Sequence, residues 1–197
     1  MFSSKPKWAE HLQQTKEAAP SGSLIRALSF VVQKDQALDL GGGGLRDTRY
    51  LLSQGFQSVT VIDREPSVVQ LASNLPTDKF QALVQDFDTF EFPTETYDII
   101  NAQYSLPFNP PETFHRVMEG IKRSLKTGGV FCGQLFGDQD EWNTPGTTFT
   151  FHTEHDAKLL FSDMELIDFQ EKVRDAILAD GKLKHWHVFN IIARKGS

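Results

Sequence analysis

A run of glycines between a predicted strand and a predicted helix is the feature with the clearest chemical meaning. It lies in residues 39–45, DLGGGGL, and glycine lets a backbone turn tightly and approach a ligand without a Cβ in the way. A dinucleotide site requires the spacing G-x-G-x-x-G. Counted from Gly41 the last position is Arg46, and counted from Gly42 it is Asp47. Both registers therefore fail.

The arrangement D-x-G-x-G fits the same loop, with Asp39, Gly41 and Gly43 at its fixed positions. It places a carboxylate at the end of the strand, where it would attract a positive amino group of a cofactor. The same carboxylate would repel the pyrophosphate of a nicotinamide dinucleotide. The loop therefore favours a cofactor that carries a positive charge.

Two further acidic residues lie at the ends of the next two predicted strands. Asp63 closes the second strand, where an acid accepts the hydroxyls of a ribose. Asp86 and Phe87 follow the third strand, where a carboxylate can accept from an adenine amino group and a ring can pack on the base. Together these residues predict a ligand that contains adenosine.

Five successive segments resemble the motifs of class I S-adenosylmethionine-dependent methyltransferases, over about residues 36–136. They are ALDLGGGG, VTVIDRE, LVQDFD, YDIINAQYSLPF and LKTGGVF, while RDTRYLL and QLFGDQDEW are closest to the small-molecule and tellurite-resistance-like members. The resemblance implies S-adenosyl-L-methionine as cofactor. It implies that the cofactor-binding residues are Asp39, Gly41 and Gly43 at the methionine portion, Asp63 at the ribose, Arg64, Asp86 and Phe87 at the adenine, and Asn101 beside the methionine amino group.

Leu45 departs from this family, in which a third glycine is usual at that position. A leucine would be strained there if the backbone needs a positive φ. Gly44 could adopt the unusual dihedral angles instead. Cofactor affinity depends on which of the two residues does so.

The methyl group of a sulfonium is already electrophilic, so the enzyme must chiefly hold donor and acceptor in line and exclude water. A general base is needed only where the acceptor carries a proton, and the sequence identifies no catalytic residue. The substrate-binding candidates are Tyr104, Trp142 and His187. Each has a structural alternative: Tyr104 would pack on its own loop, Trp142 would fasten residues 137–152 to the core, and His187 would be a structural histidine. No metal site is predicted.

Three other functions remain open. A non-catalytic S-adenosylmethionine-binding protein with the same Rossmann-like fold is the main alternative, and Leu45 is its best support. An NAD-dependent oxidoreductase is disfavoured by Asp39 and by the failed glycine spacing. A transferase that uses a decarboxylated donor would be expected to carry an acidic cluster, which we do not find in the sequence.

The elements that position these residues alternate between strand and helix, which predicts parallel βαβ units. We expect an α/β fold: a Rossmann-like, doubly wound, mostly parallel seven-stranded sheet with an antiparallel last strand and helices on both faces. The expected strands are 37–40, 59–62, 80–84, 97–102, 130–136, 164–173 and 186–194. Gly128 and Gly129 should end the helix before the fifth strand.

The 197 residues predict one methyltransferase domain over 1–197. Residues 1–34 would form a helical N-terminal cap and residues 137–152 a lid-like excursion. If these two segments close the cofactor cleft, Trp8 and Trp142 lie over it.

The formal net charge of −6 disfavours a nucleic-acid partner and leaves a small-molecule substrate. No apolar run approaches the about 20 residues that a spanning helix needs, which predicts no membrane partner. The first twenty residues are too polar for a signal peptide, and the only cysteine, Cys132, lies in an apolar run, so we expect a cytoplasmic protein. The sequence does not determine the oligomeric state.

Overall fold

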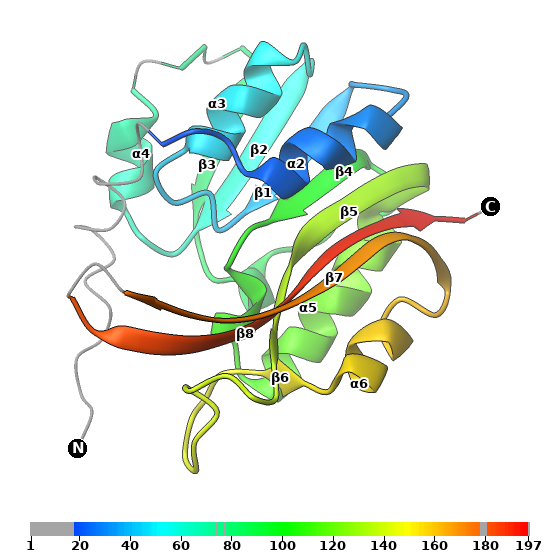
Figure 1. The fold of residues 1–197 in the computed structure, drawn as a ribbon. Coiled ribbons are helices and arrows are strands. Elements are labelled where there is room, and N and C mark those ends of the chain that lie inside the picture. Colours follow the sequence, from blue (N-terminus) through cyan, green and yellow to red (C-terminus); the bar gives the residue numbers. More distant parts are fainter. Residues whose placement is uncertain (1–17, 74, 77, 178–180, 197) are drawn as a thin grey trace.

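A twisted eight-stranded sheet runs through the molecule, as the computed structural model shows for residues 18–73, 75–76, 78–177 and 181–196 (Figure 1). The strand order is β3-β2-β1-β4-β5-β8-β7, and the short β6 pairs with β5. β1 to β6 pair in parallel, whereas β8 is antiparallel to both β5 and β7. The strands are β1 Gln36–Leu40, β2 Ser58–Asp63, β3 Phe80–Val84, β4 Tyr97–Ala102, β5 Leu125–Gly137, β6 Phe151–His152, β7 Met164–Ile177 and β8 Leu183–Lys195.

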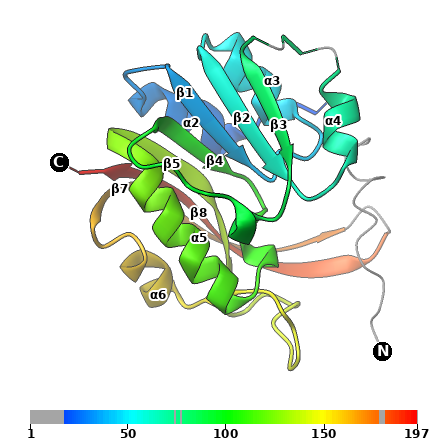
Figure 2. The same cartoon turned by 180° about the vertical axis from the view of Figure 1, so that it is seen from behind.

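Helices cover both faces of this sheet (Figures 1 and 2). One face carries α2 Gly22–Ala27, α3 Arg46–Ser53 and α4 Ser67–Leu71, and the other carries α5 Pro111–Ser124 and α6 Glu154–Leu159. Short 3-10 turns lie at η1 Leu28–Phe30, η2 Phe87–Thr89 and η3 Leu106–Phe108. The predicted Rossmann-like, doubly wound α/β fold with an antiparallel last strand is confirmed, and the two-residue β6 adds an eighth strand to the seven that were predicted.

The hydrophobic pattern of α5 explains its position. Phe114, Val117, Met118 and Ile121 have the spacing of one helix face, and all four are buried against the sheet. β4, at the centre of the sheet, is buried along its whole length. A central parallel strand with helices above and below meets no solvent on either face, and the two polar residues of β4, Asp98 and Asn101, are buried with hydrogen-bond partners.

The end of α5 differs from the prediction. The helix ends at Ser124, and Leu125 already pairs with Tyr97 of β4, so Gly128 and Gly129 lie within β5. Leu125 is fully buried, and its side chain therefore has more to gain in the core than in another helical turn. Gly128, with φ +78°, accommodates the irregularity in the pairing of β4 and β5.

Within the predicted N-terminal cap, residues 22–30 form the short α2 followed by η1. The part of that cap that contains Trp8 lies outside the described residues. The helix between β2 and β3, α4, has only five residues. No helix in the described ranges combines the length and the apolar character that a membrane crossing requires.

The excursion of residues 137–152, which follows β5, is fastened to β8 at its base. The His187 ring accepts a hydrogen bond from the Gln139 backbone N–H at Nδ1 (3.1 Å) and lies 2.8 Å from Glu171 through Nε2. Asp140 accepts from the Lys184 ammonium and from the His187 backbone N–H. The ammonium also lies 3.8 Å from the ring centroid of Trp186.

This attachment predicts a steric coupling between two residues. A Cβ on Gly137 would lie 2.2 Å from the His187 ring, so Gly137→Ala should destabilise the fold by about 1–3 kcal/mol. His187→Ala should also destabilise it, because two hydrogen bonds are lost. Urea denaturation of the double variant should show no further loss beyond that of His187→Ala, because the new methyl group fills the vacated space. Additive effects of the two substitutions would contradict the close packing.

Candidate functional site

The carboxyl ends of β1, β2 and β4 meet at one edge of the sheet and present the glycine loop. This edge is where open α/β sheets bind their ligands. The loop is tied to β2, because the Gly41 N–H donates to the Ile62 carbonyl (2.7 Å) and the Gly43 N–H donates to Asp63 Oδ2 (2.9 Å). The backbone of the loop is thereby held in place before any ligand binds.

Two of the glycines are required by close packing. Gly41 has φ +75°, and a Cβ there would lie 2.4 Å from Cβ of Ser105. A Cβ on Gly42 would lie 2.1 Å from a methyl carbon of Val61. Any side chain at either position would collide with the protein itself, so the loop forms a cradle of bare backbone that fits a cofactor.

Leu45 itself adopts the left-handed conformation, with φ 61° and ψ 19°, and the positive-φ glycines do not include Gly44. Such a conformation costs a non-glycine residue about 1–2 kcal/mol. The side chain is fully buried against Val61 and Val68. Burial of a leucine contributes about 1.5–3 kcal/mol, which offsets the strain and explains why leucine is tolerated in place of glycine.

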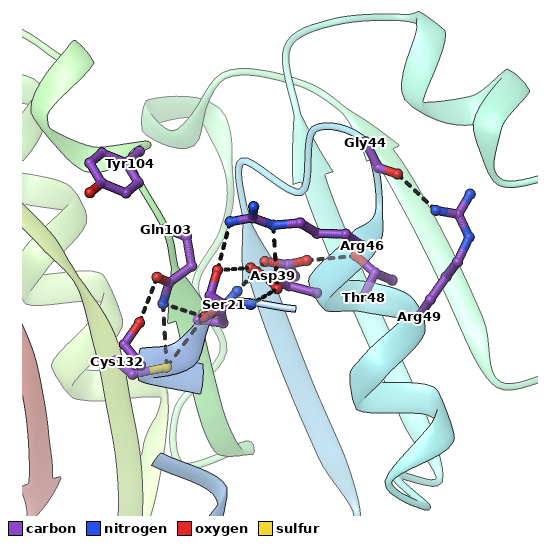
Figure 3. Close-up of polar contacts among 12 residues, drawn as sticks. Ser21, Asp39, Gly44, Arg46, Thr48, Arg49, Gln103, Tyr104 and Cys132 are labelled. Atoms are coloured by element: carbon purple, nitrogen blue, oxygen red, sulfur yellow. Dashed lines mark hydrogen bonds and ion pairs between the residues drawn. The ribbon is translucent and has the colours of Figure 1, made fainter. Parts of the chain in front are cut away.

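Asp39 is a buried carboxylate at the end of β1 (Figure 3). It accepts hydrogen bonds from the Thr48 hydroxyl (2.6 Å) and from the Asn101 amide (2.8 Å). Loss of hydration on burial, followed by the nearby charge of Asp47, raises the pKa of Asp39 to about 7. A group with this pKa gains strongly from a positive charge brought next to it.

A chain of amide side chains extends from Asp39 along the sheet. The Gln103 amide donates to Asn101 Oδ1 (2.8 Å), and the Gln134 amide donates to Gln103 Oε1 (2.7 Å). Every amide therefore donates toward the carboxylate. Sequence reasoning missed both glutamines. The signal that could have found Gln134 is a polar residue in the otherwise apolar strand VFCGQLF.

The predicted adenosine residues lie at the ends of β2 and β3. Asp63 accepts from the Gly43 N–H and from the Glu65 N–H (2.9 Å each), which leaves further lone pairs on both oxygens. Arg64 and Asp86 form a half-exposed ion pair with a 3.2 Å contact. Phe87 is buried in η2, and its ring lies 3.5 Å from the Cβ position of Gly41.

A cavity of about 350 Å³ opens beside the end of β4. Its described walls are polar and come from α2, α3, β5, β7, β8 and the turn after β4. They include Ser23, Arg46, Gln103, Tyr104, Gln134 and Asn190.

Tyr104 projects from a strained backbone at this cavity. Its φ is 50°, and its N–H donates to Gln134 Oε1 (3.0 Å). The ring packs edge-on against Trp186, with the centroids 6.1 Å apart. Strain of this kind in a non-glycine residue is typical of functional sites.

The other two predicted substrate contacts lie elsewhere. Among its described residues, the cavity lining contains neither Trp142 nor His187. Trp142 packs against Phe108, Phe136 and Phe149, and so fastens the excursion to the core. His187 is 1% exposed and bonded through both ring nitrogens. Their roles at a substrate stay predictions.

Residues 37–129 match the family model described as a methyltransferase domain. These residues are similar to a methyltransferase domain over 93 of the 197 residues of the chain. The predictions of an enzyme, of this family and of S-adenosylmethionine as its cofactor are thereby confirmed. A comparison with curated proteins finds no match.

Several solved structures share the fold of the methyltransferase. TehB from Haemophilus influenzae superposes with a TM-score of 0.76 at 19% identity, over 93% of this chain and 65% of TehB, so this chain spans less than two thirds of that protein. The 1,6-didemethyltoxoflavin-N1-methyltransferase of Burkholderia thailandensis gives 0.72 at 18% identity, over 100% of this chain and 93% of that one. The N-methyltransferase NodS from Bradyrhizobium japonicum WM9 gives 0.66 at 18% identity, over 96% of each chain.

The raised pKa of Asp39 predicts how the stability of the cofactor-free protein depends on pH. The folded state keeps a proton that the unfolded state loses above pH 3.8, so the free energy of unfolding falls as the pH rises toward 7. Asp39→Asn removes this penalty and should stabilise the fold at pH 8 by on the order of 2–4 kcal/mol, but by little near pH 4. Urea denaturation between pH 4 and 8 measures the difference.

The half-exposed Asp86 provides the control for this experiment. Asp86→Asn makes the same chemical change in a side chain that is half exposed, and is measured over the same pH range. Equal pH profiles for wild type and Asp39→Asn would contradict the burial penalty.

Proposed function

We propose that this methyltransferase transfers the methyl group of S-adenosylmethionine to a small-molecule acceptor, by in-line displacement at the sulfonium. The observation that supports this most is the polar cavity of about 350 Å³ beside the end of β4, next to the glycine loop. Its volume lies in the range of small-molecule sites, about 300–1,000 Å³. The structure of the Burkholderia thailandensis relative holds 1,6-didemethyltoxoflavin and S-adenosylhomocysteine, which agrees with a small acceptor.

The cofactor-binding roles proposed from the sequence are compatible with the contacts in the site. Asp63 would accept the ribose hydroxyls through the lone pairs that its two backbone contacts leave free. Asp39 would act on the amino group through its charge, and Thr48 and Asn101 each donate to one of its two oxygens and so hold its orientation. Phe87 would act indirectly, by supporting Gly41, because its ring is buried beneath the loop.

The remaining cofactor roles follow the same arrangement. Gly41 and Gly43 would contact the methionine portion through backbone. The ion pair of Arg64 and Asp86 would lie at the adenine, where both side chains are half exposed and free to rearrange. Asn101, bonded to Asp39, would keep that carboxylate oriented toward the amino group.

Bound S-adenosylmethionine supplies an electrophilic methyl group, and the protein supplies position. The acceptor's nucleophilic atom forms the new bond to the methyl carbon while the carbon–sulfur bond breaks and its electron pair stays on sulfur. Tyr104, at the rim between the loop and the cavity, would orient the acceptor and exclude water. A proton on the acceptor would leave to solvent or to a base of the acceptor itself.

The net charge of −6 supports an acceptor other than a nucleic acid. A cytoplasmic location also belongs to this proposal and is supported by the single, buried cysteine. Trp142 and His187 would shape the acceptor site indirectly, by holding the excursion in place.

Calorimetric titration tests the cofactor part of the proposal. Wild type should bind S-adenosylmethionine with a micromolar dissociation constant and NAD at least about a hundredfold more weakly. Asp63→Ala should weaken S-adenosylmethionine binding at least about tenfold, because the ribose loses its acceptor. Asp88→Ala, which removes a nearby acid that pairs with Arg116, is the matched control and should bind as wild type does.

The same samples test transfer. Release of S-adenosylhomocysteine should depend on an added small nucleophile. Unchanged binding by Asp63→Ala would contradict the proposed ribose site. Tight cofactor binding without product from any small nucleophile would contradict the proposed acceptor class.

A further inference from the structure

Two unpaired cations lie on the strand that borders the cavity. Lys172 and Arg174 of β7 are exposed, and neither forms an ion pair within the described part of the chain. Lys172 is part of the cavity wall. The two residues are two positions apart and therefore share one face of the sheet. They pair across to Val188 and Trp186 of β8.

Arg174 also acts on the hydroxyl of Tyr104, whose ring packs on Trp186. Burial raises the pKa of Tyr104, and the charges of Arg174 and Arg46 lower it by less. The phenol therefore stays protonated at neutral pH and can donate a hydrogen bond. The positive charges of Arg174 and Arg46 both act on it, which favours an anion as the group that accepts from it.

The other charges of the cavity wall are already compensated. Arg26 lies 3.5 Å from Asp168, and Arg46 lies 3.6 Å from Asp47 and donates to the Ser21 hydroxyl. These pairs contribute little net charge. The charges of Lys172 and Arg174 are thus the uncompensated ones at this site, although the whole chain carries −6.

The amide chain supplies the neutral part of the wall. Asn190 and Gln103 each lie within hydrogen-bond distance of the Gln134 amide, which donates to both. A polar ligand that enters the cavity therefore meets both donors and acceptors on the sheet and cations on β7.

We propose that the cavity is the acceptor site and that it selects a small organic carboxylate, held by Lys172, Arg174 and the Tyr104 hydroxyl. This inference rests on the proposed function and names the class of its acceptor. The carboxylate is the handle by which the acceptor is oriented, and a separate nucleophilic atom of the same molecule receives the methyl group. The methyl transfer itself is the same in-line displacement at the sulfonium that is described under the proposed function, because the carboxylate forms no bond to the methyl carbon.

Matched aromatic probes test the charge selectivity directly. Benzoate, benzamide and benzylamine have similar size and carry negative, no and positive charge. We expect titration calorimetry on the protein saturated with S-adenosylhomocysteine to show benzoate binding about tenfold or more tighter than benzamide, with no binding of benzylamine. The preference should shrink as the salt concentration rises.

Variants assign this preference to the two cations. Lys172→Gln with Arg174→Gln should abolish the preference for benzoate and leave the affinity for S-adenosylhomocysteine unchanged, since both side chains are exposed and lie outside the cofactor loop. Lys158→Gln, which removes one positive charge from α6 on the other face of the sheet, is the matched control and should keep the preference.

The outcomes separate this inference from the proposed function. If S-adenosylhomocysteine fails to bind, the proposed function itself is wrong. If it binds but benzamide binds as well as benzoate, or benzoate does not bind at millimolar concentration, the selectivity is wrong and the proposed function stands. A preference that survives in the Lys172→Gln, Arg174→Gln double variant would also overturn the assignment.

Discussion

The burial of one carboxylate constrains the whole site. Asp39 lies at the end of β1, out of contact with water, and its two oxygens depend on Thr48 of α3 and Asn101 of β4. Ionisation of a buried carboxylate whose hydrogen-bond donors are both neutral costs free energy. This cost arises at the edge where a positively charged cofactor is expected. The same side chain joins β1, α3 and β4 through its two hydrogen bonds.

The same carboxylate organises groups that lie further along the sheet. Asn101 donates to Asp39 and accepts from Gln103, and Gln103 in turn accepts from Gln134. The Gln134 carbonyl then holds the backbone of Tyr104 in its left-handed conformation. The edge that carries the glycine loop and the cavity beside the end of β4 therefore share one polar network, in which each amide orientation is determined by its neighbours. This network fixes the position of the edge relative to the cavity.

Two other features fix the local conformation through buried side chains. Leu45 combines a strained backbone with a fully buried side chain, so the glycine loop is stabilised by the core beneath it. Lys184 and Asp140 are buried as an ion pair between Trp186 and the excursion, which fixes the base of a segment of loops. Such a pair adds little net stability but makes wrong arrangements costly, because each charge is strongly destabilising without its partner.

The sequence by itself determined the alternation of strands and helices, the glycine loop, and the acids at three successive strand ends, because periodicity and loop composition are local properties. It also predicted the antiparallel final strand pair from the short connection between 173 and 186. The tertiary structure alone decided what each polar side chain contacts. It placed Leu45 rather than Gly44 at positive φ, ended α5 at Ser124, and turned Trp142 and His187 toward the protein. It brought together Gln103, Gln134 and Asn190, and set Lys172 and Arg174 beside Tyr104. These outcomes depend on which side chains from distant segments compete for the same buried space and the same hydrogen-bonding partners, and that competition exists only once the sheet has assembled.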